Sequence, residues 1–384
     1  MWRHIASNAL TCLIVLIFLM AGVILWGKNQ YASEGPLADQ MCLRVERGQT
    51  MRRVSENLEE QGAISSGTIF RLGAEYTDKS GALKAGSWLI PEGSSMGDIV
   101  ELVTKGGAST CGTEVVYRIG VTSLETLVRE LDTETEKYVE VASFNPNEDE
   151  APEAYTSVRD ESDTRYRIAV AEGVTSWQIV QGLKAADVLD GEVAEIPGEG
   201  WLAPDSYEVR RGDTRTEVLQ EMQQKQEYIL AEAWGSKADD VPLEDSYQAL
   251  ILASIVEKET GLAEERRQVA SVFANRLNRG MRLQTDPTVI YGITEGKGIL
   301  GRGLRQSELR KGTPFNTYII EGLPPTPIAN PGRASIEAAV NPDSTDYIFF
   351  VADGTGGHAF AKTLDEHNAN VAEWRKIEAE RNSQ

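Results

Sequence analysis

The hydrophobic pattern of the chain begins with one long uncharged stretch, from Ile5 to Gly27. As a helix, such a stretch is long enough to cross a bilayer core of ~30 Å. It predicts a transmembrane helix over residues 9–27. The alternative is a cleaved signal peptide, but the apolar core of such a peptide is normally only ~7–15 residues long, and no A-x-A cleavage site follows convincingly.

The charges around this stretch predict its orientation. Arg3, His4 and the free amine precede it, and only Lys28 follows soon after it. The positive-inside rule therefore predicts a short cytoplasmic tail, residues 1–8, and places the rest of the chain outside. Residues 28–40 are predicted to be a linker.

One pattern then occurs three times, beginning at Leu43, Tyr117 and Tyr166. Each copy has alternating apolar and polar residues, then a Gly or Ser/Thr turn that is able to cap a helix. Apolar residues at i, i+3 and i+4 follow the turn. Each copy is therefore predicted to form a strand, a turn and an amphipathic helix.

Residues 41–111 extend the first copy with a helix in "SSGTIFRLGAEYT", a strand in "LKAGSWLIPEG" and a helix in "MGDIVELVTKG". This order resembles a LysM-like βααβ module, the small fold that holds GlcNAc-containing polymers. A purely structural spacer gives the same pattern, so both interpretations stay open. Trp88 is accordingly either a platform for a sugar or a core residue.

Residues 112–194 contain the other two copies. Between these copies, residues 144–165 are acidic, contain Pro and have few apolar residues. That composition predicts a mobile surface insertion.

Residues 195–384 have a different pattern, with longer predicted helices and loops rich in Gly and Pro. Long helices are predicted in "DTRTEVLQEMQQKQEYILAEAW", "SYQALILASIVEKET" and "LAEERRQVASVFANRLNRG", followed by a short helix in "SIEAAVNP" and a strand in "DYIFFVAD". Loops dense in Gly and Pro, such as "QTDPTVIYGI", separate them, and loops of this kind commonly carry functional sites. The chain is thus predicted to be an α+β protein with an N-terminal transmembrane helix, a LysM-like module and a mixed helical and strand domain.

The second long helix, with Asp245 or Ser246 as its cap, carries two carboxylates at its C-terminal end. Glu257 and Glu259 point about 200° apart on a helix, so only one of them is central to a site. Side chains lean toward the preceding turn, which puts Glu259 over apolar residues, and the negative helix end near it also disfavours ionisation. Glu259 is therefore the better candidate for a general acid, although a merely solvated helix end has the same periodicity.

Composition limits the classes of partner and cofactor. The net charge of −21 opposes binding to nucleic acid and to anionic membrane surfaces. Cys42 and Cys111 are able to form a disulfide or to remain two free thiols. With three histidines in the chain, a histidine metal site is improbable, and no metal or cofactor is predicted.

Several motifs together carry a family resemblance. They are "EGWLAPDSYEV", "ASIVEKET", "ERRQVASVFANRLNRGMRLQTDPTVIYG", "TPFNTYIIEGLPPTPIANPG" and "YIFFVADGTGGHAF". Over most of residues 195–370 the chain resembles the endolytic murein transglycosylases of the MltG (YceG-like) family.

The resemblance implies a lyase that cleaves the β-1,4 bond between MurNAc and GlcNAc within peptidoglycan and leaves 1,6-anhydroMurNAc ends. It assigns the catalytic role to Glu259. It also implies a single-pass protein of the bacterial inner membrane, with a cytoplasmic N-terminus, a periplasmic catalytic domain and peptidoglycan synthases as partners in cell wall biogenesis. Two alternatives stay open: a non-catalytic glycan-binding scaffold for such synthases, and a muramidase that uses water.

Polar loops are expected to build the substrate groove around this acid. Amide and hydroxyl groups suit N-acetyl and sugar hydroxyl recognition, and tyrosine faces suit the apolar side of a pyranose. The predicted substrate-binding residues are Gln284, Thr285, Asp286, Thr288, Tyr291, Asn316, Tyr318 and Glu257. Asn330 and His358 are further candidates, each with a structural alternative.

Overall fold

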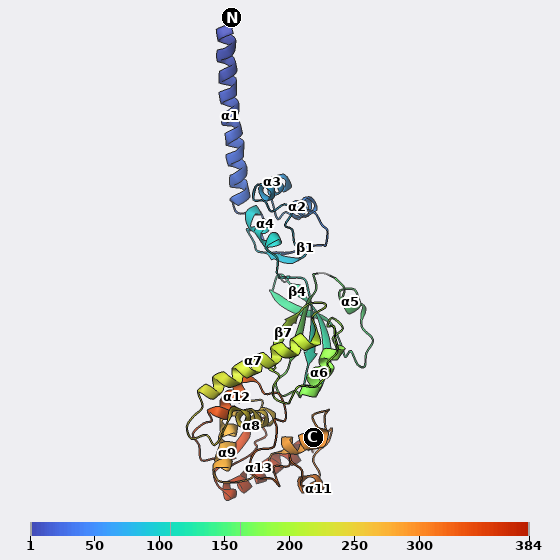
Figure 1. Ribbon diagram of the computed structural model, residues 1–384, viewed down its shortest axis with the longest axis vertical. Helices are drawn as coiled ribbons and strands as arrows, with labels where there is room; N and C mark the ends of the chain where they lie inside the picture. The colour runs from blue at the N-terminus through green and yellow to red at the C-terminus, as the bar shows by residue number, and fades with distance from the viewer. Residues whose placement is uncertain (1, 108, 162, 383–384) are drawn as a thin grey trace. The chain divides into compact units, whose positions relative to one another are not determined.

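The computed structural model describes residues 2–107, 109–161 and 163–382, and within them the side chains from Leu10 to Arg381. Its contacts divide the chain into two compact units. The first comprises Met1–Val115, Leu127–Ser143 and Ala151–Arg165, and the second Val116–Thr126, Phe144–Glu150 and Tyr166–Gln384. Helices and strands occur in both, so the predicted α+β class is confirmed (Figure 1).

The first helix, α1 (Trp2–Ala32), contains the uncharged stretch. Its segment Leu10–Ala32 has a mean hydropathy of 2.6 over its most apolar window, and no residue of that window is buried, which is compatible with a membrane span. The helix runs on to Ala32, into the segment predicted as a linker, because no Pro or turn signal interrupts it before that point. The side chains of Arg3 and His4, which predicted the orientation, lie outside the described side chains.

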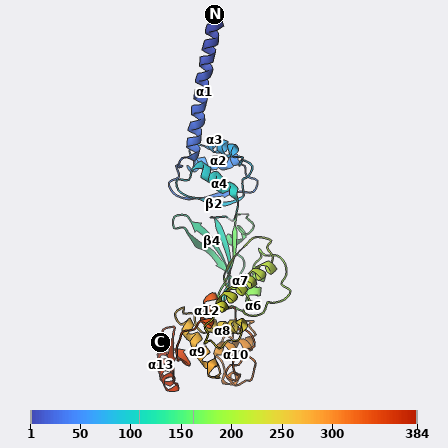
Figure 2. The ribbon, with the colours of Figure 1, turned by 60° about the vertical axis from the view of Figure 1, so that its left-hand side comes forward.

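Five short elements follow in the first unit. They are β1 (Met41–Val45), α2 (Met51–Glu60), α3 (Gly67–Tyr76), β2 (Gly86–Ile90) and α4 (Met96–Lys105). The predicted βααβ order is thus present, with α2, α3, α4 and β2 grouped together below α1 in Figure 2. Strand β1 pairs antiparallel with β2, with Leu43 opposite Trp88. Each helix begins at a hydroxyl that caps it, on Thr50, Ser66 and Ser95.

Trp88 lies in the core of this module with 2% of its surface exposed, so it is a core residue and not a sugar platform. Tyr31 and Leu37 pack against the same core. The amide of Gly35 also donates to the carbonyl of Gly93 at 3.0 Å. Much of the segment predicted as a linker is therefore attached to the module.

Cys42 and Cys111 form a disulfide with their Cα atoms 5.8 Å apart, which decides between the two alternatives for these cysteines. The bridge closes a loop with a sequence separation of 69 residues. A loop of that length lowers the entropy of the unfolded chain enough to stabilise the folded state by about 4 kcal/mol.

A five-stranded sheet follows, in the order β5-β4-β3-β6-β7. Its strands are β3 (Thr113–Ile119), β4 (Leu124–Asp132), β5 (Lys137–Phe144), β6 (Arg165–Val170) and β7 (Ser206–Val209). The helix predicted after Tyr117 is wrong, because those residues form β4. Pairing with neighbouring strands outweighs the helical pattern of these residues. Arg129 on β4 also forms an ion pair with the buried Glu114 on β3 at 2.5 Å, a contact that no local pattern shows.

The third copy of the pattern forms as predicted, with β6 followed by α6 (Ser176–Ala185). Thr175 and Gln178 form a capping box at the start of α6. Gly182 on this helix permits a close approach to β3, since a Cβ there would come within 2.4 Å of the Ile119 side chain.

The acidic segment 144–165 is not simply a mobile insertion. It contains the short helix α5 (Glu153–Thr156), in which Tyr155 is buried. Asp163 is also buried, accepts the Ser87 hydroxyl at 2.6 Å and pairs with Arg44 at 3.2 Å. A buried tyrosine and a buried aspartate with two partners thus anchor a segment whose composition alone predicts disorder.

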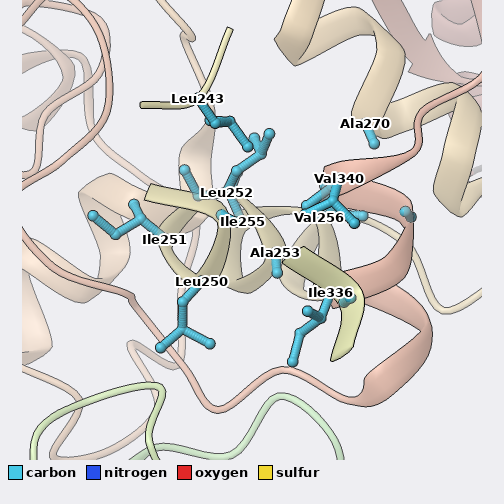
Figure 3. Close-up of a cluster of buried hydrophobic side chains, with 14 of the residues drawn as sticks. Leu243, Leu250, Ile251, Leu252, Ala253, Ile255, Val256, Ala270, Ile336 and Val340 are labelled. Carbon is cyan, nitrogen blue, oxygen red and sulfur yellow. The ribbon is translucent and has the colours of Figure 1, made fainter. Parts of the chain in front are cut away.

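The second unit is built around α8 (Ser246–Glu259), which packs against α7 (Arg215–Gly235), α9 (Arg266–Asn278) and α12 (Arg333–Val340). Asp245 caps α8 by accepting the amide of Gln248 at 2.8 Å. Residues 249–256 are all buried, as expected for a helix that is apolar on every side (Figure 3). This core holds the C-terminal end of α8 rigidly.

The part predicted as Gly- and Pro-rich loops contains more regular structure than expected. Its elements are α10 (Asp286–Thr294), α11 (Gln306–Leu309), the antiparallel pair β8 (Phe349–Ala352) and β9 (His358–Ala361), and α13 (Leu364–Asn382). The strand predicted in "DYIFFVAD" is thus present as β8. The loop predicted in "QTDPTVIYGI" is wrong, because Pro287 lies in the first turn of α10, where a proline is favourable.

Candidate active site

The last turn of α8 separates the two carboxylates. Thr260 leaves the helix in an extended conformation. Glu257 then accepts the backbone amide of Gly332 at 3.0 Å, whereas Glu259 accepts the hydroxyl of Thr285. The two side chains have different partners, in agreement with the divergence predicted from helix geometry.

The surroundings of Glu259 favour its protonated form. The side chain is partly buried at the end of the apolar helix. Burial raises the pKa of its carboxyl, and the negative charge of Asp286 adds to the increase, while the Thr285 hydrogen bond and the charges of His358 and Arg276 oppose it. Since the net shift is upward, Glu259 keeps a proton to a higher pH than an exposed glutamate.

A network of three threonines fixes the group that contacts Glu259. The amide of Thr285 donates to the hydroxyl of Thr317 at 3.1 Å, and the hydroxyls of Thr317 and Thr288 lie 2.9 Å apart. Thr285 is also the N-cap residue of α10. The hydroxyl that reaches Oε1 of Glu259 is therefore held by buried bonds.

Asp286 and Tyr318 form a second pair beside this carboxyl. The Tyr318 hydroxyl donates to Asp286 at 2.6 Å. Burial raises the pKa of Tyr318, so it remains a neutral hydrogen-bond donor. The structure thus brings four of the predicted residues together: Glu259, Thr285, Asp286 and Tyr318.

Other predicted residues shape loops. Asn316 is fully buried, and its amide donates to three carbonyls, those of residues 308, 309 and 311, while its oxygen accepts the amide of Tyr318. The geometry therefore disfavours direct substrate contact by Asn316, and by the equally buried Thr288. Gln284 is exposed, with a left-handed φ of 52°.

Two basic residues near Glu259 have clear structural partners. Arg276 is buried and donates to the carbonyls of Ile348 and Leu283 at 2.7 and 2.6 Å. His358 binds Glu265 through both its backbone amide and Nδ1, each at 2.8 Å. Both residues brace the strands and loops around the site, and both lower the pKa of Glu259.

The structure also identifies a carboxyl to which the sequence assigned no role. Glu199 accepts the Ser176 amide at 2.7 Å, the Asn330 side chain at 3.2 Å and the Tyr291 hydroxyl at 3.2 Å. Burial raises the pKa of Glu199. Glu199 stands between two glycines, a local sequence that is common in exposed turns. Its burial therefore results from contacts with residues distant in sequence, which the local pattern does not indicate.

A cavity of about 450 Å³ lies beside α10. Lys258, Pro287 and Tyr291 line it, with the glycine-rich segment 296–302. Burial lowers the pKa of Lys258, whose ammonium donates to the Gly173 carbonyl at 3.2 Å. Glu259 itself is not among the lining residues.

The chemistry available at this site is proton transfer. Among the described residues, no group of three or more His, Cys, Asp or Glu side chains is arranged to hold a metal ion. The site offers one carboxyl with a raised pKa, a fixed hydroxyl partner, and neighbouring amide, hydroxyl and tyrosine groups. Such a carboxyl is suited to protonate a leaving oxygen.

Comparisons with known proteins show which family and relatives the chain resembles. The model of the YceG-like family matches residues 43–145 and 143–373. The endolytic murein transglycosylase of Bacillus subtilis (strain 168) is 28% identical over 356 residues, which cover 91% of this chain and 89% of that protein. The endolytic murein transglycosylase of Streptococcus pneumoniae serotype 2 (strain D39) is 27% identical over 384 residues, which cover 96% of this chain and 65% of that protein. A crystal structure of a YceG-like protein from Listeria monocytogenes has 25% identity and a TM-score of 0.46, covering 86% of this chain and 99% of that one.

Proposed function

The chain belongs to the YceG-like family, and from that premise we propose that it is an endolytic murein transglycosylase with Glu259 as its general acid and base. The observation that carries the proposal is the position of Glu259 at the end of a buried helix, where one of its oxygens accepts the fixed Thr285 hydroxyl and burial raises its pKa. The names of the relatives, which match over most of this chain, support the same activity.

In the proposed reaction, Glu259 protonates the oxygen of the β-1,4 bond between MurNAc and GlcNAc. The C–O bond breaks, and positive charge develops at C1 of MurNAc, where the carboxylate or the acetamido group of the sugar stabilises it. The carboxylate then takes the proton from the MurNAc C6 hydroxyl as that oxygen bonds to C1. The product is a 1,6-anhydro end, and because the nucleophile belongs to the substrate, no second carboxylate is needed.

The other parts of the chain support a location at the wall. The segment Leu10–Ala32 is proposed to anchor the protein in the plasma membrane, with the N-terminus in the cytoplasm and the catalytic unit outside. The βααβ order of residues 41–111 supports a LysM-like module that acts as a holder or spacer on glycan. Peptidoglycan synthases are the proposed partners, because they produce the strand that this enzyme cuts.

One observation supports a second candidate, a muramidase that uses water. That reaction needs another carboxylate near the acid, and Asp286 is exposed and acts electrostatically on Glu259. Asp286 is, however, engaged by the Tyr318 hydroxyl. We therefore favour the intramolecular route.

Digestion of purified peptidoglycan followed by mass spectrometry tests the proposal. Anhydro ends within strands are expected. Reducing ends would instead support the muramidase, and intact glycan would support a non-catalytic scaffold. Asp286→Asn separates the first two further, since it should abolish a water-using reaction while leaving anhydro products.

A further inference from the structure

A second cavity, of about 410 Å³, lies within the second unit and has no role in the chemistry described above. Three segments distant in sequence form most of its wall: residues 119–124 between β3 and β4, residues 145–148, and the start of α6. Lys297, Gly298 and Ile299 complete the lining.

The lining has the chemistry of a site for a neutral sugar. Trp177, in the first turn of α6, is partly exposed and lines the cavity. Asn145, Asn147 and Gln181, which carry amides, and Ser123, which carries a hydroxyl, line the same space, together with one acidic residue, Glu148, and one basic residue, Lys297. An aromatic face with neighbouring amides and hydroxyls suits a pyranose that carries N-acetyl and hydroxyl groups.

This cavity adjoins the one beside α10. The two share the lining residues Val121, Thr122, Gln178, Gly298 and Ile299. The cavity beside α10 extends to Lys258 and Pro287, the immediate neighbours of Glu259 and Asp286 in the chain. Residues adjacent in sequence to the proposed acid and residues around Trp177 thus line two adjoining cavities.

Hydrogen bonds hold the shared wall in place. The side-chain amide of Gln178 donates to the carbonyl of Val121 at 2.8 Å. The hydroxyl of Thr175 donates to the carbonyl of Gly296 at 2.6 Å. Both bonds join the start of α6 to the segments opposite it, so the surface is formed before a ligand arrives.

We propose that the cavity around Trp177 is a distal subsite that binds an N-acetylated amino sugar of the glycan strand, away from the bond that is cut. The inference rests on the proposed function, since an enzyme that cuts within a strand has sugars on both sides of the scissile bond. Binding energy from such remote sugars supports the reaction at the acid. Stem peptides of murein are the competing occupant, and the test includes them.

The test measures binding and cleavage with peptide-free glycan strands of two lengths. In an inactive Glu259→Gln background, Trp177→Ala should weaken the binding of long strands by roughly threefold to tenfold, the loss expected for one aromatic contact. Binding of short oligosaccharides, which do not reach Trp177, should not change. In the active enzyme, KM for long strands should rise by a similar factor.

Two variants control this measurement. Trp177→Phe keeps an aromatic face and should recover most of the binding, which a mere folding defect in the alanine variant would not predict. Tyr228→Ala removes an aromatic residue that is 64% exposed on α7 and does not line either cavity, and it should bind both lengths like the parent.

The outcomes separate this inference from the proposed function. Equal losses for short and long strands, no loss for either, or competition by free stem peptides would overturn the subsite. If the wild type binds long strands through Trp177 but releases no anhydro product, the proposed activity fails while the subsite stands. If the wild type cleaves normally and Trp177→Ala has no effect, the proposed activity stands while the subsite fails.

Discussion

Glu199 and Glu259 are two carboxyls of the same unit whose pKa values burial raises. They differ in their partners. Glu199 accepts hydrogen bonds from a backbone amide, a side-chain amide and a tyrosine hydroxyl on three separate segments. Glu259 accepts the Thr285 hydroxyl on one oxygen and lies near the charges of Arg276, His358 and Asp286.

This difference shows that a raised pKa alone does not identify a catalytic acid. Both oxygens of Glu199 are used to join α6, α10 and the loop at Asn330, so its function is to hold the unit together. In the proposed reaction, Oε1 of Glu259 is held by the Thr285 hydroxyl and Oε2 contacts the substrate. The hydrogen-bond partners, and not the burial, are what distinguish Glu199 from Glu259, the acid proposed above.

The largest effect on activity is expected from replacing each carboxyl in turn by an amide. Glu259→Gln should lower the rate of anhydro-product formation by about 10²- to 10⁴-fold, since the general acid is lost while glycan binding is kept. Glu199→Gln should retain activity within about tenfold, because an amide still satisfies its partners. Product analysis on peptidoglycan measures both.

The exposed Glu227→Gln on α7 is the matched control and should be fully active. Full activity in Glu259→Gln would move the acid to Glu257 or to another residue.

The second prediction concerns stability, which we expect to fall more on substitution of Glu199 than of Glu259. Glu199→Ala should lower the free energy of unfolding by about 3 kcal/mol or more, because each buried donor left unpaired costs about 1–3 kcal/mol. Glu259→Ala should cost less, since it leaves one hydroxyl without its acceptor. Urea denaturation of the two variants measures the difference, and equal losses would contradict the comparison.

The third prediction tests the fixed hydroxyl. The Thr285 hydrogen bond lowers the pKa of Glu259, so Thr285→Val should raise that pKa further. The alkaline limb of the pH–rate profile should then move to higher pH, with a change in maximal rate of less than about tenfold. Thr285→Ser, which keeps the hydroxyl, should leave the limb in place, and a shift toward lower pH in the valine variant would count against the assignment.

The smallest effect is a dependence of stability on pH. The folded-state pKa of Glu259 is above the ordinary value of 4.5, so the folded protein holds this proton more tightly than the unfolded chain. The contribution to stability is fully present below pH 4.5 and is lost as pH rises through the folded pKa. Urea unfolding across this range should show a shallower decline for Glu259→Gln than for the wild type, whereas Glu227→Gln should match the wild type.

The local patterns of the sequence account for a large part of the fold. The uncharged stretch of α1, the capped helices α7 and α8, and the βααβ order of residues 41–111 follow from periodicity and caps, which act over a few residues. The divergence of Glu257 from Glu259 follows from helix geometry alone. Family resemblance, and not periodicity, selected Glu259 over a merely solvated helix end.

Contacts between distant segments decided the rest. The residues of β4 satisfy a helical pattern, but hydrogen bonding to β5 and β3 makes them a strand of the sheet. The sequence predicts Asn316 as a sugar ligand, but its amide donates to three backbone carbonyls. The burial of Glu199 depends on hydrogen-bond donors from three segments, one of which is the Ser176 amide. Sequence specifies which groups are present and which faces of a helix they occupy, whereas hydrogen-bond satisfaction and burial depend on the tertiary arrangement that brings the partners together.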